Sequence, residues 1–480
     1  MDNEEQKSMR LIDFFLESPN SLDTLSRQDC KDILMLACMT AESTNQTEIK
    51  GKCYSLLYEC CFHMDLDIKE LWNIYIILND NLFIDANIPF RGYLDKLYRF
   101  IFLKIKEPLS DLYVPYTNTS SNLIVITTDQ FLRIGHAPTR RVLDYAYAIV
   151  SGLGKAVMIV NGADLNFHKC HSLIYSREFN FLEELNNVKH INYKGIEFPF
   201  MQIDAKMPDL YCIREALDEI YSLQPELVYN IGGSEILADL CQMFTKTCCF
   251  PCSTNIPITM SRYLLVGRKL QSFDSERLSR LEDYQRTVET VVNYQLPQYG
   301  GNPYKRSDWN ISDSDFVFGM VGNRLDDEID EAFTDLINRI LSDSDAHFLI
   351  IGNLRNTERI LNAVSKPEKI HFTGRLSDAA LAVGLFDVYL NPHRNGGGRS
   401  SFEALAQGVP VITFAYGDVY YTCGDEFAVE DSEDFAETAF RYITDCEYRE
   451  EQRRRGLKRA ERLSGIASTQ REALDKILND

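Results

Sequence analysis

Three consecutive glycines between an apolar strand and a helix constrain this chain more than any other feature. Residues 391–413 read as the end of a buried strand, then Gly396, Gly397 and Gly398, a short helix that ends near Gly408, and a second apolar strand. Glycines have no Cβ, so an anion can approach the main chain closely, and the helix N-terminus supplies N–H groups and the positive end of a dipole. We therefore predict a phosphate site at a strand–helix joint of an α/β domain.

Polar side chains around the glycines strengthen this interpretation. Arg394, Arg399, Ser400 and Ser401 add donors and positive charge, and Glu403 follows one turn later, where it can accept hydrogen bonds from ribose hydroxyls. An ordinary strand–turn–helix joint is the alternative, but such joints rarely combine three glycines, two arginines and two serines. The pattern favours a bound nucleotide.

Composition limits the classes of partner. With 480 residues, 45% apolar and 25% charged, the chain is typical of a globular protein of two or three domains. A net charge of −21 disfavours nucleic acid, and the basic run at residues 448–455 is expected to be a solvated helix face. We find no apolar run long enough for a transmembrane helix, and the start of the chain is polar and acidic where a secretory signal would be basic and then apolar. We expect a cytoplasmic protein.

The 13 cysteines are scattered through apolar segments, which is typical of reduced, buried thiols. Two groupings could suggest a metal: the segment from His168 to His171, and Cys248-Cys249-x-x-Cys252. Neither has a second pair of ligands at a suitable spacing, so packing is the expected role and no metal site is predicted.

The pattern of apolar residues divides the chain. Residues 1–118 show helical spacing, as at 30–37 and 94–101, and predict an α-helical N-terminal region. After a polar boundary at 116–122, short apolar strands alternate with helical segments through residues 119–300, which predicts a parallel-sheet domain. Its expected strands are 123–128, 156–160, 227–230 and 263–266.

A second parallel sheet is expected after a Pro- and Gly-rich linker at 296–304. This domain covers residues 305–465, and residues 466–480 form a C-terminal helix that we expect to pack back on the first sheet domain. The expected strands of the second sheet are 316–321, 348–351, 370–373, 386–390 and 411–414.

Two such domains in series, with a glycine-rich anion loop and a following carboxylate, resemble the GT-B fold of nucleotide-sugar glycosyltransferases, and most closely the retaining family 4. That family carries the motif E-G-F-G-x-x-x-x-E-A-x-A-x-G-x-P-V-I, onto which residues 395–412 align without a gap. Glu403 falls on the second glutamate, which implies that it holds the ribose. Asn395 falls on the first, which contacts the transferred sugar in the family, and here a neutral amide replaces that charge. The resemblance covers 305–465 well and 119–300 by strand order only.

Two further turns carry the resemblance. Gly322-Asn323-Arg324 is similar to the family's Gly-Arg-Leu turn, which implies that Arg324 grips the diphosphate. Ile329 stands where the family has a lysine, and Arg394 or Arg399 could replace that cation from the glycine loop. Gly374-Arg375 resembles the turn against which the nucleotide base lies.

The chemistry implied is the departure of a nucleotide diphosphate, whose growing negative charge must be met by fixed donors. Gly397, Gly398, Ser400, Arg399 and Arg324 are the candidates, and His393 could approach the donor sugar. The resemblance implies no metal and no tightly bound cofactor.

The acceptor side is expected in the first sheet domain. His136 follows its first strand after Gly135, and Pro138 suits the first turn of a helix. The histidine could act as a general base or bind the sugar or phosphate, while a helix-capping role is the alternative.

The sequence therefore predicts a glycosyltransferase that moves a sugar from a UDP-sugar to a glycan or protein acceptor, without metal and with retention. The alternative is a catalytically silent GT-B subunit that stabilises a partner transferase or recognises a glycosylated protein. A UDP-sugar epimerase is a third option. An NAD-dependent dehydrogenase is disfavoured because the first strand is not followed by a G-x-G-x-x-G turn. The oligomeric state is left open.

Overall fold

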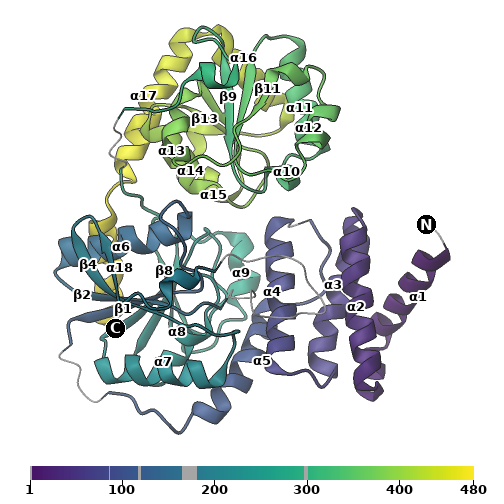
Figure 1. Ribbon diagram of the computed structural model, residues 1–480, viewed down its shortest axis with the longest axis vertical. Helices are drawn as coiled ribbons and strands as arrows, with labels where there is room; N and C mark the ends of the chain where they lie inside the picture. The colour runs from purple at the N-terminus through teal and green to yellow at the C-terminus, as the bar shows by residue number, and fades with distance from the viewer. Residues whose placement is uncertain (1–2, 86, 117–120, 165–180, 297–300) are drawn as a thin grey trace. The chain divides into compact units, whose positions relative to one another are not determined.

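The computed structural model describes residues 3–85, 87–116, 121–164, 181–296 and 301–480, which form two compact units (Figure 1). The first unit comprises residues 1–289 together with 471–480, and the second comprises residues 290–470. Parts of the predicted boundary at 116–122 and linker at 296–304 lie outside the described residues, as do His168, Cys170 and His171.

Five α-helices open the first unit, as the helical spacing predicted: α1 Asn3–Glu17, α2 Arg27–Ser43, α3 Thr47–His63, α4 Ile68–Ile84 and α5 Leu94–Lys106. Two of them begin with reciprocal capping boxes. The Ser26 hydroxyl accepts from the Asp29 N–H at 3.2 Å, and the Asp67 carboxylate accepts from the Glu70 N–H at 2.9 Å. Each cap satisfies N–H groups that a helix start leaves unpaired.

The first sheet has the strand order β3-β4-β2-β1-β5-β6-β7-β8 and is parallel except for the β3–β4 pair. Helices α6 Ala137–Leu153, α7 Leu210–Leu223, α8 Ile236–Leu240 and α9 Ser275–Leu278 accompany it. The strands are β1 Leu123–Thr128, β2 Ala156–Asn161, β3 His190–Tyr193, β4 Ile196–Gln202, β5 Leu227–Gly232, β6 Lys246–Pro251, β7 Tyr263–Val266 and β8 Arg286–Glu289.

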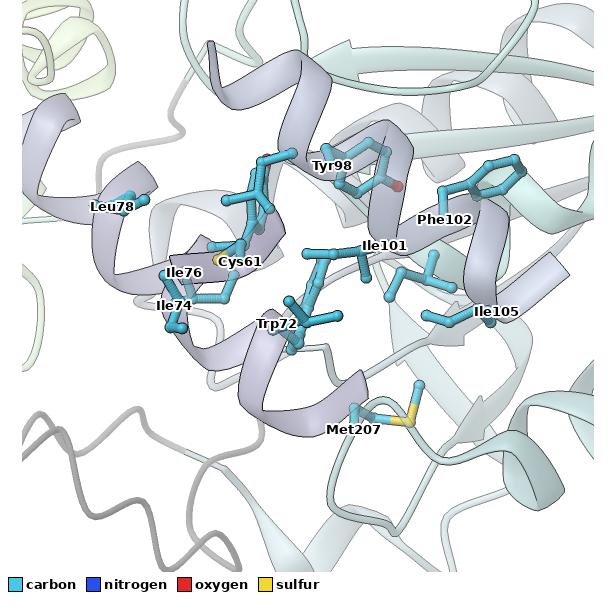
Figure 2. Packing of buried hydrophobic residues seen from close by; sticks show 14 of the residues in the cluster. Cys61, Trp72, Ile74, Ile76, Leu78, Tyr98, Ile101, Phe102, Ile105 and Met207 are labelled. Carbon is cyan, nitrogen blue, oxygen red and sulfur yellow. The ribbon is translucent and has the colours of Figure 1, made fainter. Parts of the chain in front are cut away.

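The helical region shares one hydrophobic core with this sheet. Figure 2 shows Trp72 of α4 and Tyr98 and Phe102 of α5 in the same cluster as Met207, which follows β4. The Trp72 indole N–H donates to the Asp164 carbonyl at 3.0 Å, just beyond β2. The five helices are therefore packed as part of the first unit.

A single buried carboxylate carries much of this junction. Asp239 of α8 accepts from the Tyr98 hydroxyl at 2.6 Å, from the Met260 N–H at 2.6 Å, and from the hydroxyls of Thr259 and Ser261 at 2.5 and 2.7 Å. Burial raises the pKa of Asp239, and the four donors oppose that rise by stabilising the ionised form. Asp239 thus connects α5, α8 and the segment that precedes β7.

The end of the chain also packs in the first unit. Helix α18, Ile466–Leu478, crosses the boundary between the units, and residues 471–480 belong to the first. The Lys246 ammonium donates to the carbonyls of Ile477 and Leu478 at 3.1 and 2.8 Å, and the Tyr263 hydroxyl donates to Asp480 at 2.7 Å.

The second unit is a doubly wound sheet with the order β11-β10-β9-β12-β13-β14, parallel throughout, with helices on either side of it (Figure 1). Its strands are β9 Val317–Val321, β10 His347–Ile351, β11 Ile370–Phe372, β12 Val388–Leu390, β13 Val411–Phe414 and β14 Ala428–Val429. Its helices are α10 Leu325–Glu328, α11 Glu331–Ser342, α12 Thr357–Ala363, α13 Ala379–Ala382, α14 Gly398–Ala406, α15 Gly417–Cys423, α16 Ser432–Thr444 and α17 Cys446–Arg462.

The direction in which successive strands are added to the second sheet reverses between β9 and β12, while all the strands stay parallel. From β9 the order runs outward through β10 and β11 on one side, and from β12 through β13 and β14 on the other. Ligands of open parallel sheets bind at the carboxyl ends of the strands at such a switch point. The predicted arrangement of two parallel sheets after a helical region is confirmed.

Asp239→Ala is expected to lower the free energy of unfolding of the first unit by about 3–5 kcal/mol, because four buried donors lose their charged acceptor. Tyr98→Phe removes one donor and should cost about 1 kcal/mol. The two tryptophans are Trp72 in the first unit and Trp309 in the second, so urea unfolding of a Trp309→Phe protein reports Trp72 alone. Equal losses for the two variants would contradict the role given to Asp239.

Candidate functional site

The glycine loop joins β12 to α14 at the switch point. Gly397 has a φ of +96° in the left-handed region and caps α14 without a side-chain hydrogen bond. A Cβ on Gly398 would lie 2.9 Å from both the Thr422 hydroxyl and the Tyr294 hydroxyl, so a larger residue there would force its neighbours to shift. The first N–H groups of a helix have no partner within the helix, and here the cap supplies none. This N-terminus can receive an anion.

The two serines of the loop differ in their surroundings. Ser401 is fully buried, and its hydroxyl donates to the Gly398 carbonyl at 2.9 Å. The Ser400 hydroxyl is only half-buried; it donates to the Gly397 carbonyl at 3.0 Å and lies 2.9 Å from the Tyr389 hydroxyl. Ser401 therefore supports the turn from inside, whereas Ser400 lies at the surface of the helix start.

The Arg394 guanidinium is buried, with 3% of the side chain exposed. It donates through Nε to Asn391 Oδ1 at 2.8 Å, and through Nη2 to the Tyr389 hydroxyl at 2.8 Å and the Val321 carbonyl at 3.1 Å. Burial opposes its charge, but the nearby Tyr389 and Glu328 outweigh that effect, so its pKa is raised. Arg394 holds the carboxyl ends of β9 and β12 together.

Glu328 of α10 lies between two arginines, which the sequence analysis did not foresee. Its carboxylate accepts from Arg394 Nη1 at 2.9 Å and from Arg324 Nε at 3.2 Å, and only 6% of its side chain is exposed. Arg324 is 37% exposed, and its Nη2 atom lies 3.0 Å from where a Cβ on Gly396 would be. Arg324 therefore places a partly exposed guanidinium directly beside the glycine loop.

Glu403 is bound by a neighbouring cation. Its carboxylate accepts from Arg399 Nε at 3.0 Å, one turn earlier on α14, and both side chains are largely buried. The predicted ribose carboxylate is thus held in a fixed position near the first turn of the helix, with Arg399 compensating its charge.

Asn395 and His393 lie beside Tyr416, which follows β13. The Tyr416 hydroxyl donates to Asn395 Oδ1 at 2.6 Å. The His393 ring stacks on the Tyr416 ring with centroids 4.3 Å apart and planes within 9°, and His393 is exposed. Tyr416 is a further residue that sequence reasoning missed, because a lone tyrosine after a strand carries no motif.

The remaining predicted residues follow the other strands of the same edge. Gly322 and Asn323 follow β9, and a Cβ on Gly322 would lie 2.7 Å from Arg394 Nη1. Gly374, with a φ of +65°, and the exposed Arg375 follow β11. All the residues predicted to bind the nucleotide sugar therefore lie at the carboxyl edge of the sheet in the second unit.

His136 belongs to the first unit, where it caps α6. Its Nδ1 atom lies 3.0 Å from the Thr139 hydroxyl, which also accepts from the Leu132 N–H at 2.7 Å. Burial lowers the pKa of His136 to about 4, so the imidazole is neutral at pH 7. A neutral imidazole can accept a proton, as a general base must. The same contacts with Thr139 also stabilise the start of α6, as the alternative helix-capping role requires.

Two cysteines of the predicted grouping at residues 248–252 belong to the hydrophobic core. Cys248 and Cys249 are buried in strand β6, which lies between β5 and β7, and burial raises the pKa of both thiols. Within the described ranges, no three His, Cys, Asp or Glu side chains are arranged to hold a metal ion. None of the helices that the structure describes is both long and apolar enough to span a membrane.

Solved structures identify the fold class. The chain is similar to a mutant O-GlcNAc transferase of Thermobaculum terrenum, with a TM-score of 0.58 and 15% identity over 99% of this chain and 93% of that one. It is also similar to sucrose-phosphate synthase of Thermosynechococcus elongatus, with a TM-score of 0.53 and 12% identity over 74% of this chain and 99% of that one. The Anabaena protein HepE in complex with UDP gives a TM-score of 0.51 and 9% identity over 74% of this chain and 100% of that one. The fold is GT-B.

The family comparison agrees with this class. Residues 315–445 match the family model described as glycosyl transferases group 1. No curated protein sequence matches the chain. The fold and the matched segment define a GT-B glycosyltransferase whose second unit is of the group 1 type, as the family 4-like motif predicted.

Replacing Glu328 with alanine should destabilise the second unit by about 3–5 kcal/mol, since a buried guanidinium then loses its carboxylate. Replacing Glu328 and Arg394 together with methionine should restore most of that loss. Hydrogen exchange of peptides that cover β9 and β12 would measure both effects, with the exposed Glu331→Ala as the control. If the double variant exchanged faster than Glu328→Ala, the pairing would not be the source of the stability.

His136 should make the first unit less stable in acid. Its folded pKa of about 4 lies below the usual value of about 6.5, so the unfolded chain binds more protons between these values and stability falls as the pH drops from 7 to 4. We expect His136→Gln to reduce the difference in unfolding free energy between pH 7 and pH 4.5 by about 1–3 kcal/mol. Urea unfolding followed by Trp72 fluorescence tests this, and an unchanged difference would exclude the shifted pKa.

Proposed function

We propose that this glycosyltransferase moves a sugar from a UDP-sugar to a glycan or protein acceptor, without a metal ion and with retention of configuration. One observation carries the proposal: the uncapped N-terminus of α14 lies at the switch point of the second sheet with the partly exposed Arg324 beside it. A leaving diphosphate gains negative charge in the transition state, and fixed N–H groups and a guanidinium at that position stabilise it.

The residues around the loop take distinct roles in this proposal. The N–H groups that follow Gly397 and the Ser400 hydroxyl bind the diphosphate, and Arg324 meets the developing charge. Glu403 accepts from the ribose hydroxyls, and Arg399 fixes its orientation. Because the helix dipole and Arg324 supply the positive charge, no metal is required for this step.

A uridine nucleotide is supported by the similarity to HepE, whose structure contains UDP. In this proposal the base lies against Gly374 and Arg375 at the end of β11. The donor sugar lies near Asn395, His393 and Tyr416, where a neutral amide and two stacked rings present polar and flat surfaces. The resemblance to family 4 supports retention.

The acceptor is proposed to use the first unit. His136 is neutral at pH 7 and can act as a general base or bind the acceptor. The five N-terminal helices support a protein acceptor, and the likeness to the O-GlcNAc transferase, which extends over 99% of this chain, includes them. Those helices share a core with the sheet that we assign to the acceptor.

One observation favours the silent subunit as a second candidate. Glu328 neutralises part of the charge of Arg324 and Arg394, and Glu403 neutralises Arg399, so the loop carries little net positive charge. Titration of UDP, UDP-glucose and UDP-GlcNAc by calorimetry, followed by assays of hydrolysis and transfer, separates the two. An enzyme releases sugar, whereas a silent subunit binds nucleotide at most.

Arg324→Met should lower kcat/KM by about 10²–10³-fold, corresponding to roughly 3–4 kcal/mol of transition-state stabilisation. Glu403→Gln should weaken UDP binding by about tenfold, because one charge-assisted hydrogen bond to the ribose is lost. Arg441→Met on the exposed face of α16 serves as the control. Wild-type kinetics in both site variants would reject the site.

A further inference from the structure

A cationic cavity lies on the second unit between α17 and the turn that precedes β14. Its volume is about 310 Å³. Five cationic side chains line it: Arg454, Arg455, Lys458, Arg459 and Arg462. Two carboxylates, Glu426 and Glu451, complete the lining. The cavity thus has a surplus of positive charge in a chain whose net charge is −21.

Ion pairs do not remove this surplus. Arg454 and Arg455 share a single carboxylate, that of Glu451, at 3.1 and 2.9 Å. Lys458 and Arg462 have no ion-pair partner among the residues that the structure describes. A phosphate with two negative charges would meet cations that are not already compensated.

One of the cations is fixed in place. Arg459 donates through Nε to the Thr422 carbonyl at 2.8 Å and through Nη2 to the Tyr421 carbonyl at 3.0 Å. These acceptors are neutral, so they orient the guanidinium and leave its charge intact. An oriented guanidinium loses less freedom when it binds an anion than a mobile one would.

The core does not need this face of α17. The helix packs through a narrow stripe of Gln452, Gly456 and Ala460, and a Cβ on Gly456 would lie 3.0 Å from Leu405 Cδ2. Elsewhere along α17 the ordinary pattern of a solvated helix holds, with Arg453 paired to Glu450 at 3.3 Å. Arg449 of α17, which lies outside the cavity, donates to the Tyr442 carbonyl at 2.6 Å.

We propose that this cavity binds the phosphate groups of an anionic ligand. Guanidinium and ammonium groups are the side chains that recognise phosphate best. A volume of about 310 Å³ leaves room for a phosphate group and part of its hydration shell. The overall negative charge of the chain repels long polyanions, so a compact phosphate ligand or a phosphate headgroup fits the site better than a nucleic acid. The residues that line the cavity are not those of the glycine loop, and the proposal does not depend on the proposed function.

Inorganic pyrophosphate, titrated by calorimetry at low salt, is the first probe. Lys458→Glu/Arg462→Glu should weaken binding at this site at least tenfold. Both side chains are exposed, so the folded structure is retained. The matched control is Lys189→Glu/Lys476→Glu, which makes the same change in net charge at exposed positions outside the cavity and should bind as the wild type does. The titrations are repeated with Arg324→Met added to each protein, which distinguishes pyrophosphate binding at the cavity from binding at the glycine loop.

Vesicles of phosphatidylglycerol and of phosphatidylcholine are the second probe. Sedimentation with phosphatidylglycerol alone, lost in Lys458→Glu/Arg462→Glu, identifies a lipid headgroup as the source of the phosphate. Pyrophosphate binding without sedimentation identifies a free phosphate ligand. The proposal is overturned if neither probe binds, if the cavity variant binds as tightly as the wild type, or if the control loses as much affinity as the cavity variant.

Discussion

The second unit depends on one buried guanidinium. Arg394 reaches from the glycine loop to the ends of β9 and β12 and to α10, and each of its contacts is a hydrogen bond that a low-dielectric interior strengthens. Its charge requires a carboxylate, which Glu328 provides. Since the same carboxylate also binds Arg324, the fold and the site share a single electrostatic arrangement. The position of the catalytic candidate is therefore a consequence of how the unit stabilises its own core.

This arrangement explains why the region around the glycine loop has three arginines but only a small net positive charge. Of the three arginines, Arg394 is buried in contacts with the strands and α10, and Arg399 is paired with Glu403. Arg324 is the most exposed of the three and can best reach a ligand. A donor bound here would depend mainly on main-chain N–H groups and on one guanidinium. Such donors are already oriented before the reaction, so they need little reorganisation as charge develops.

The sequence was most informative where one residue type has one physical use. Three glycines predicted the loop because only glycine permits a φ of +96° and the close contacts at Gly398, and strands β1, β7 and β13 were predicted with their observed bounds. Strands β3, β4, β6, β8 and β14 were not predicted. Charged, proline or cysteine residues mask the β pattern in β4, β6 and β8, and β3 and β14 are only four and two residues long. Glu328 and Tyr416 were missed because a carboxylate bridging two arginines and a ring stacked on His393 arise from tertiary packing, which spacing along the chain does not encode.

The first unit also depends on one buried charged side chain, Asp239. Asp239 gathers four donors from the helical region and the sheet, so the helices are held by a polar network as well as by the apolar surfaces of Trp72 and Tyr98. A junction of this kind has a defined geometry, because hydrogen bonds fix orientation where apolar contacts alone would allow sliding. If the helices guide an acceptor, they do so from a fixed position on the first sheet. The acceptor would then bind to a preformed surface, so the free energy of binding would not be reduced by the entropy lost in ordering that surface.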